Sequence, residues 1–267
     1  MAEEPKTLTP EEIEILRATT FLKAALPLLE EVAESDEEVK KMIAPWNFAV
    51  QLQVKTGSPA AYVLFENGTL KVEQGKHANP LITMTFKEVK LMNDFFAGKM
   101  VLPSIKGLNH PVILIKFLLK LFMKLKMLMP EYKCKNEAEK ELKVRMLIYM
   151  VSFALQEMSR GGDEYVYRMT KTAHKKIVEF LVLPEGPAAY IKINEGVIKG
   201  IKGRTNRRPY CSMDFKDLES ALMVLTNQVG PLDANKQGLV TSRGTPEYSI
   251  KIGGLMQRVN NFLMEEG

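Results

Sequence analysis

Lysines recur at every fourth position along the most apolar stretch of the chain, residues 112–129. At the ~100° per residue of an α-helix, Lys116, Lys120 and Lys124 fall on one narrow stripe. The opposite side carries only apolar side chains, namely Ile115, Leu118, Phe122, Leu125 and Met129, with Leu114 and Leu121 beside them. Such a helix can present its ammonium groups to an anionic headgroup and its apolar side to an acyl chain or to a protein core.

Two interpretations of this helix remain open. A membrane span is disfavoured because each lysine near the bilayer centre costs about 2.5–3.5 kcal/mol. The helix can cover a sheet as part of an ordinary core. Its apolar surface can also line a tunnel, meet a second domain or touch an anionic membrane transiently, and its flexible methionines, Met123, Met127 and Met129, suit ligands of varying shape. The interpretations are compatible, because a tunnel wall is also a core.

Residues that could support catalysis are sparse. No nucleophile elbow, zinc-protease motif or phosphate-binding loop occurs, and three histidines and two distant cysteines, Cys134 and Cys211, lack metal-ligand spacing. We therefore expect no enzyme activity, no cofactor and no metal. Cys211 is expected to be a small buried residue.

A basic cluster near residue 200 is a second candidate site. Five bases lie within ten residues, and the simpler interpretation is a solvated charged loop rather than a specific anion site. Only Tyr210 is nearby as a stacking platform, so we expect no nucleic-acid partner. The cluster comprises Lys199, Lys202, Arg204, Arg207 and Arg208.

Charge is distributed unevenly along the 267 residues, although 37 bases against 32 acids give only +5 overall. Residues 1–44 carry eleven acids and five bases, whereas residues 99–145 carry eleven bases and four acids. The first six residues lack an apolar leader, and two unpaired cysteines fit a reducing compartment, so a cytoplasmic location is expected.

An internal repeat organises the chain. Pro59–Tyr62 and Pro187–Tyr190 share the sequence Pro-Ala-Ala-Tyr 128 residues apart, and residues 84–88 match residues 213–217 at an offset of 129. A period of this length predicts two tandem homologous domains rather than a solenoid.

The elements of each copy follow from local patterns. Alternation predicts strands over 48–54, 61–65, 69–73 and 81–85, and Asn67-Gly68 predicts a hairpin turn. Thr85 and Asp214 stand where helix caps belong, predicting a helix over 86–97 that ends at Gly98. Further helices are expected over 10–44, with a break at Pro27, and over 111–129, 136–160 and 252–264.

This order of motifs resembles the sterol carrier protein type 2 family. The resemblance rests on turns ending in Asn67-Gly68 and Glu195-Gly196, and on a strand that enters Phe86-Lys87-Glu88-Val89 or Phe215-Lys216-Asp217-Leu218. It continues through Ala97-Gly98-Lys99-Met100 and a short strand that ends in Gly107 or Gly244. The second copy departs from it, because Asn227-Gln228-Val229 replaces the Gly-Lys motif.

The resemblance implies an α+β fold with two tandem domains, each a curved, mostly antiparallel sheet covered by helices around a hydrophobic tunnel. It divides the chain into an N-terminal helical segment (1–45), a first domain (46–130), a linking helix (131–164) and a second domain (165–267). It also implies non-enzymatic binding and transfer of a fatty acid, acyl chain or sterol-like lipid. Because the same fold serves as an accessory module, a structural or protein-interaction role with filled cores, built as an internal pseudo-dimer, is the alternative.

Candidate ligand-binding residues come from the helices of both copies. The first copy is favoured, because the last helix of the second is more polar. The candidates are Met92, Phe95, Phe96, Leu114, Leu118, Leu121, Phe122 and Leu125 in the first copy, and Leu222, Leu225, Leu255, Val259 and Phe262 in the second. Lys116, Lys120 and Lys124 are the candidate contacts to a headgroup or an anionic membrane. Ligand identity, protein partner and oligomeric state stay open.

Overall fold

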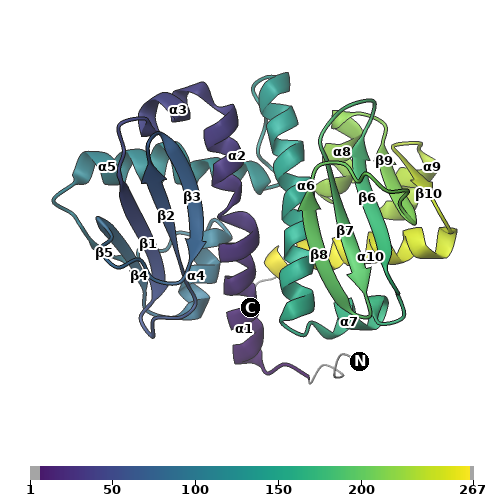
Figure 1. Ribbon diagram of the computed structural model, residues 1–267, viewed down its shortest axis with the longest axis horizontal. Coiled ribbons are helices and arrows are strands. Elements are labelled where there is room, and N and C mark those ends of the chain that lie inside the picture. The colour runs from purple at the N-terminus through teal and green to yellow at the C-terminus, as the bar shows by residue number, and fades with distance from the viewer. Residues whose placement is uncertain (1–6, 265–267) are drawn as a thin grey trace. The chain divides into compact units, whose positions relative to one another are not determined.

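The computed structural model describes residues 7–264 and divides them into two compact units, one of residues 10–126 and one of residues 127–264 together with residues 7–9. Each unit holds one five-stranded sheet with its own helices (Figure 1). The predicted α+β class with two similar sheets is thus confirmed. Residues 1–6 and 265–267, parts of the predicted N-terminal segment and second domain, lie outside the described residues.

The first sheet has the order β3-β2-β1-β4-β5. Only the central pair, β1 with β4, is parallel, and the other neighbours are antiparallel. The sheet is therefore mostly antiparallel, as predicted. Its strands are β1 (Phe48–Val54), β2 (Ala60–Glu66), β3 (Thr69–Gln74), β4 (Ile82–Phe86) and β5 (Ser104–Lys106).

The second sheet repeats this arrangement as β10-β9-β6-β7-β8. Again only the central pair, β6 with β9, is parallel. The register repeats too: Phe48 faces Phe65, and 128 residues later Lys176 faces Ile193. The strands are β6 (Lys176–Val182), β7 (Ala188–Asn194), β8 (Val197–Lys202), β9 (Cys211–Phe215) and β10 (Val240–Arg243).

Two pairs of glycines fix the backbone in both copies. Gly68 and Gly196 close the hairpins at φ of 76° and 88°, as the Asn67-Gly68 signal predicts. Gly107 and Gly244 follow the fifth strands with φ of 96° and 128°. A Cβ at Gly107 would collide with the carbonyl oxygen of Leu81, and one at Gly244 would lie 2.9 Å from that of Tyr210. Only glycine fits where these chains pass so closely.

Helices of the first unit lie on one face of its sheet. α2 and α3 pack on β3, α4 packs on β4, and α1 packs on α4. Pro27 ends a π-helical segment before α2, at the expected break. The elements are α1 (Pro10–Thr20), the π-helical segment Phe21–Ala25, α2 (Leu28–Ser35), α3 (Glu37–Ile43), α4 (Val89–Phe96) and α5 (Pro111–Ile115), which continues into a π-helical segment (Lys116–Leu121) and a 3₁₀ segment (Phe122–Leu128).

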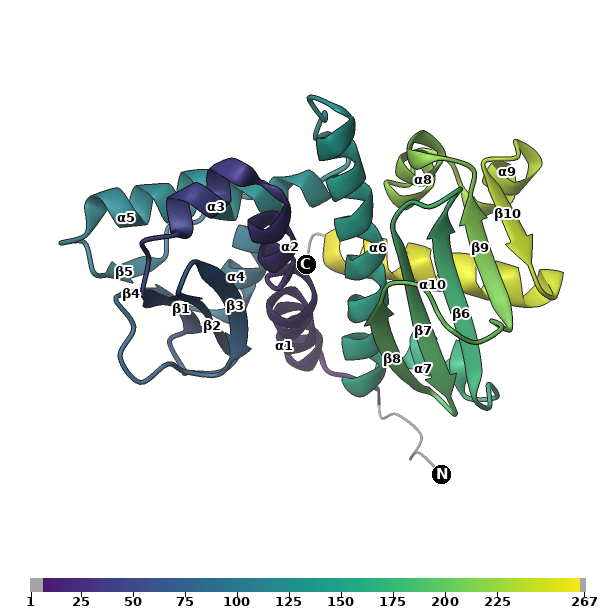
Figure 2. The same cartoon turned by 45° about the horizontal axis from the view of Figure 1, so that its top comes forward.

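In the second unit the long helix α6 lies along β7 and β8, and α8 and α10 pack on β9 (Figure 2). A Cβ at Gly200 of β8 would lie 2.7 Å from the carbonyl oxygen of Ser152, so this glycine lets α6 approach the sheet. No helix among residues 7–264 is long and apolar enough to cross a membrane. The helices are α6 (Glu137–Arg160), α7 (Glu164–Thr170), α8 (Leu218–Leu225), α9 (Pro231–Lys236) and α10 (Pro246–Met264).

The helix caps lie three residues further along the chain than predicted. Thr85 and Asp214 lie inside β4 and β9, and the helices begin after Glu88 and Asp217. Asp217 caps α8 by accepting a hydrogen bond from the backbone N–H of Ser220 at 2.8 Å. Pairing with the neighbouring parallel strand carries β4 through Phe86, so tertiary hydrogen bonding overrides the local capping signal.

Candidate functional site

The helical stretch 111–128 changes its hydrogen bonding twice, from α to π to 3₁₀. A π turn closes between residues five apart, so side chains beyond it rotate away from the positions that 100° per residue predicts. Ile115, predicted on the apolar side, is 55% exposed, and Phe117, the neighbour of Lys116 in the sequence, is fully buried. The predicted faces of this helix are corrected accordingly.

The inner side of this helix meets a cluster of aromatic rings. Phe122 lies 4.8 Å from Phe95 and 5.6 Å from Phe96, between ring centroids. Phe117 reaches Phe65 of β2 at 6.3 Å. The structure therefore brings the predicted residues Phe95, Phe96 and Phe122 together. We call this set the aromatic cluster, and it also includes Phe21, stacked on Phe96 at 5.2 Å, and Phe86, 5.2 Å from Phe95.

The remaining predicted ligand residues are mostly core residues. In the first unit, Leu118 is half-buried and the others are buried: Met92, Leu114, Leu121 and Leu125. In the second unit, Leu222 is half-buried and the others are buried: Leu225, Leu255, Val259 and Phe262. Leu225 also borders a pocket of about 430 Å³, with Leu128, Leu147 and Asn260 among its other lining residues. The hydrophobic tunnel stays a prediction.

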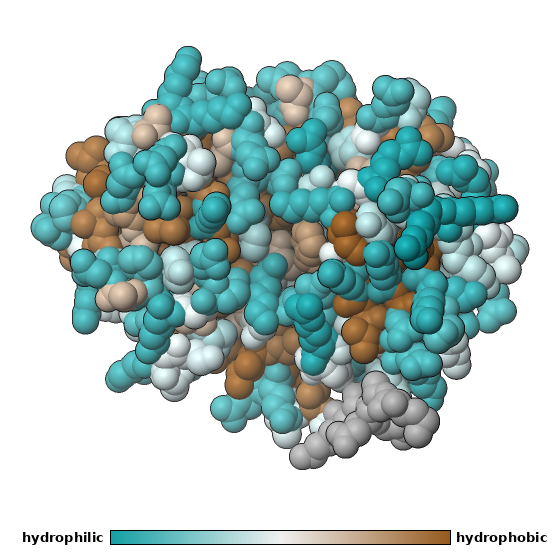
Figure 3. Space-filling view, in the orientation of Figure 1, coloured by the Kyte–Doolittle hydropathy of each residue, from teal (hydrophilic) through white to brown (hydrophobic). Residues whose placement is uncertain are grey.

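The outer side of the same helix exposes apolar side chains. Val112, Ile115, Leu119 and Met123 follow each other at helical spacing and all reach solvent. The segment before the helix adds Met100, Leu102 and Leu108, of which the first two are 99% and 92% exposed. We call these seven residues the apolar strip. In Figure 3 brown side chains gather at the left edge, where Figure 1 places α5.

The surroundings of the apolar strip are basic. No acidic residue occurs between positions 95 and 130, whereas six lysines do. Lys106, Lys116 and Lys120 are exposed, and none of them forms an ion pair with another described residue. Lys116 and Lys120, predicted as headgroup contacts, are therefore exposed, and their role as headgroup contacts stays a prediction.

Lys124 has a different role from the other two lysines. Its Nζ lies 2.6 Å from Oδ2 of Asp36, the residue that caps α3. Partial burial alone would raise the pKa of Asp36. The hydrogen bonds from Lys124 and from the backbone N–H of Val39 outweigh burial, and the pKa of this carboxyl is lowered. Lys124 thus fastens the helix to α3.

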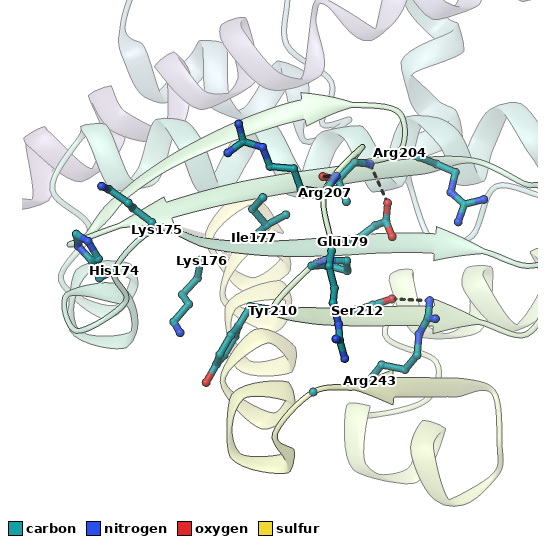
Figure 4. A pocket seen from close by; sticks show the side chains of 14 residues that line it. His174, Lys175, Lys176, Ile177, Glu179, Arg204, Arg207, Tyr210, Ser212 and Arg243 are labelled. Carbon is teal, nitrogen blue, oxygen red and sulfur yellow. Dashed lines mark hydrogen bonds between the residues drawn. The ribbon is translucent and has the colours of Figure 1, made fainter.

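A second site lies on the open face of the second sheet. A groove of about 840 Å³ is lined by cations from β6, β10 and the loop between β8 and β9 (Figure 4). We call it the basic groove, and its charged or titratable lining residues are His174, Lys175, Lys176, Glu179, Arg204, Arg207, Arg208 and Arg243. Of these residues, only Arg204, Arg207 and Arg208 are predicted as a cluster from the sequence, because the other cations join them through strand pairing.

No family model matches the sequence, and no curated protein matches it. Several solved structures do match.

The chain is similar to sterol carrier protein 2. The sterol carrier protein 2 of Yarrowia lipolytica is 11% identical with a TM-score of 0.34, and the match covers 43% of this chain and 92% of that chain. Sterol carrier protein domain 2 of Helicoverpa armigera is 17% identical with a TM-score of 0.30, over 42% and 87% of the two chains. The stereoselective inverting sec-alkylsulfatase Pisa1 of Pseudomonas is 12% identical with a TM-score of 0.26, over 55% and 28%.

Proposed function

We propose that residues 10–126 bind lipid at the apolar strip and that the protein acts in lipid binding and transfer without catalysis. The observation that carries this proposal is the double-sided character of helix 111–128. Its inner side is already buried on the aromatic cluster, yet its outer side exposes a second apolar row. A protein core needs only the buried inner side of the helix. A contiguous apolar surface that stays exposed marks a binding site.

Charge complementarity argues for a membrane surface as the occupant. Lys106, Lys116 and Lys120 lie in a stretch of sequence without acids and form no ion pair with another described residue, so their charges are available to an anionic surface. Each lysine near such a surface contributes about 1 kcal/mol. Each apolar side chain that leaves water completely contributes about 1.5–3 kcal/mol. Together these terms support reversible attachment to anionic lipid, as transfer requires.

The irregular backbone of the helix supports entry of an acyl chain beneath it. π and 3₁₀ turns have poorer hydrogen-bond geometry than an α-helix, and within helices they often mark hinges or functional sites. Here both occur directly over the aromatic cluster. We infer that displacement of this helix admits one acyl chain against Leu118, Leu121 and Phe122.

Vesicle binding tests the surface part of the proposal. The variant Val112→Gln/Ile115→Gln/Leu119→Gln removes the centre of the strip, and Val197→Gln/Leu232→Gln/Ile250→Gln removes three equally exposed apolar residues of the second unit. We expect the first variant to bind phosphatidylserine-containing vesicles at least about tenfold more weakly, and the second to bind like the wild type. Equal loss in both variants contradicts the proposal.

A bulky substitution tests the inner site. Leu118 is half-buried at the edge of the aromatic cluster, so Leu118→Trp is expected to fill space for an acyl chain with little loss of stability. Fluorescent fatty-acid titration and thermal unfolding measure the two effects separately. Parallel loss of both would identify the position as ordinary core.

The aromatic cluster also favours a second candidate function. Rings in mutual contact fill the space between helix and sheet, as a structural or protein-interaction module with a filled core requires. Native mass spectrometry distinguishes the two. A co-purified or added acyl ligand supports lipid binding, whereas protein that takes up none and binds no vesicle supports the interaction module.

A further inference from the structure

We propose that the basic groove of the second unit binds clustered phosphate groups. This site is separate from the apolar strip in residues, unit and ligand chemistry. The groove lies on the sheet face opposite the helices, where Ile177, Glu179 and Ser212 form its floor. Its volume of about 840 Å³ is that of a pocket for a drug-sized or nucleotide-sized molecule.

The cations converge from three separate segments. His174, Lys175 and Lys176 come from the start of β6, and Arg243 comes from the end of β10. Arg204, Arg207 and Arg208 come from the loop between β8 and β9. Figure 4 shows labelled members of all three segments on the open face of the sheet, and all of them line the groove. If the arginines of the loop were only solvated surface charges, there would be no reason for the start of β6 and the end of β10 to carry further cations beside them.

Most of these cations lack a counter-charge. Arg204, Arg207 and Arg208 form no ion pair with any described residue, and all three are exposed. Lys176 places its Nζ 3.5 Å from the centre of the Tyr210 ring rather than on a carboxylate. Unpaired guanidinium groups that converge on one hollow provide the fork-shaped donors that bind phosphate oxygens two at a time.

Two buried carboxylates position the cationic groups. Oε1 of Glu179 accepts a hydrogen bond from the backbone N–H of Thr205 at 2.9 Å, which anchors the arginine loop to the floor. Oδ2 of Asp214 lies 2.7 Å from Nη2 of Arg243, and Ser212 donates to the same carboxylate. The head of Arg243 is thereby fixed at the groove while its side chain stays 62% exposed. A side chain that is already fixed by such contacts loses less conformational entropy when a ligand binds.

The first copy serves as an internal control. At the positions of His174, Lys175 and Lys176 it carries Trp46, Asn47 and Phe48, and in the corresponding loop it carries Ala78-Asn79 in place of Asn206-Arg207-Arg208. The same sheet order and register form without these five side chains, whereas Arg204 and Arg243 have basic counterparts in the first copy, Lys76 and Lys106. The fold therefore does not require the five additional side chains of the second copy, and their concentration around one groove favours a ligand.

The geometry points to phosphate groups carried either by a soluble polyphosphate ester or by a phosphorylated lipid headgroup. Both present the same doubly charged groups a few ångströms apart. We would titrate the full-length protein with inositol hexakisphosphate by calorimetry at physiological salt. In parallel we would measure sedimentation with vesicles of phosphatidylcholine that contain either phosphatidylinositol bisphosphate or an equal charge of phosphatidylserine.

Arg204→Gln/Arg207→Gln/Arg208→Gln tests the site, and Lys133→Gln/Lys135→Gln/Lys216→Gln is the matched control with the same loss of charge at exposed positions outside the groove. We expect the arginine variant to bind inositol hexakisphosphate about a hundredfold more weakly and the control to bind within about threefold of wild type. Circular dichroism establishes that both variants are folded, and Arg207→Gln alone provides a milder second variant.

The results of these titrations and sedimentation measurements distinguish a soluble polyphosphate ester from a lipid headgroup, and they can overturn the inference. Binding to inositol hexakisphosphate but not to the bisphosphate vesicles identifies a soluble ligand, and binding to both identifies a headgroup. The inference is overturned by wild-type protein that binds neither probe, by equal losses in the two variants, or by binding to an RNA oligonucleotide alone. Phosphatidylserine binding through the apolar strip is measured independently, so failure here leaves the proposed function intact.

Discussion

Gln51 and Glu179 occupy the same position in the two copies and accept the same hydrogen bond. Oε1 of Gln51 accepts from the backbone N–H of His77 at 2.7 Å, and Oε1 of Glu179 accepts from that of Thr205 at 2.9 Å. Gln51 also donates from Nε2 to the carbonyl oxygens of Ala61 and Gly75, at 2.9 and 3.0 Å. A carboxylate cannot donate in this way, so the second copy has exchanged a neutral buried link for a buried negative charge beneath the basic groove.

The exchange is reversible by mutation. Glu179→Gln is expected to keep the hydrogen bond from Thr205, because an amide oxygen also accepts, and to destabilise the protein by about 1 kcal/mol, because it removes a negative charge from beneath the cations of the basic groove. Gln51→Glu is expected to destabilise it by about 1–3 kcal/mol, because it places an unpaired charge among carbonyl oxygens. Urea unfolding at neutral pH measures both. A stabilising Gln51→Glu variant would contradict this account of the position.

Removal of the Lys124 ammonium is expected to cost about 1 kcal/mol of unfolding free energy at neutral pH, since it unpairs Asp36. Because the folded-state pKa of Asp36 is lowered, the pair stabilises the fold above the unfolded-state pKa of ~3.9, and this contribution is lost as pH falls through the folded-state value. Urea unfolding of Lys124→Met from neutral to acidic pH measures this, with the exposed, unpaired Lys120→Met as control. A cost that stayed constant below pH ~3 would be evidence against the ion pair.

The close approach at Gly107 can be separated from its backbone angle. Gly107 and Gly75 have similar φ values, 96° and 93°, but a Cβ at Gly75 meets nothing within 4 Å. Gly75→Ala is therefore expected to cost about 1 kcal/mol, the cost of positive φ alone. Gly107→Ala is expected to cost about 2–4 kcal/mol, because the methyl group also displaces the strand at Leu81. Thermal unfolding distinguishes them, and equal shifts would count against the close approach.

Phe122 and Met123 are neighbours with opposite environments. Phe122→Ala opens a cavity in the aromatic cluster and is expected to cost about 3–5 kcal/mol. Met123→Ala lies in the apolar strip, is 37% exposed, and is expected to change stability by less than about 1 kcal/mol. Denaturant unfolding measures both, and similar costs would show that the helix faces are assigned wrongly.

Much of the fold is predictable because its signals are local. Alternating residues over 48–54 and the left-handed pair Asn67-Gly68 each specify their structure within a few residues. The repeat then carries the same assignment into the second copy. Helix starts were misplaced where a long-range interaction competes, since pairing with β1 extends β4 past the capping signal at Thr85.

The site was less predictable for the same reason. A regular helical wheel cannot anticipate the π turn that buries Phe117 and exposes Ile115. The basic groove joins residues 174–176 to Arg243 through two strand pairings, which no local window contains. A position-by-position comparison of the two copies would have indicated the groove. It aligns Trp46, Asn47 and Phe48 with the basic or titratable residues 174–176.

Each sheet is covered by helices on one face only, and this has a consequence for how the chain can change. Substitutions at exposed positions, away from caps, glycines and buried polar groups, usually alter stability by less than about 0.5 kcal/mol. The open face of a duplicated sheet is thus a place where new side chains accumulate without cost to folding. One copy can keep its original surface residues while the open face of the other copy acquires new ones. A single polypeptide can thus hold two similar sheets with different surfaces.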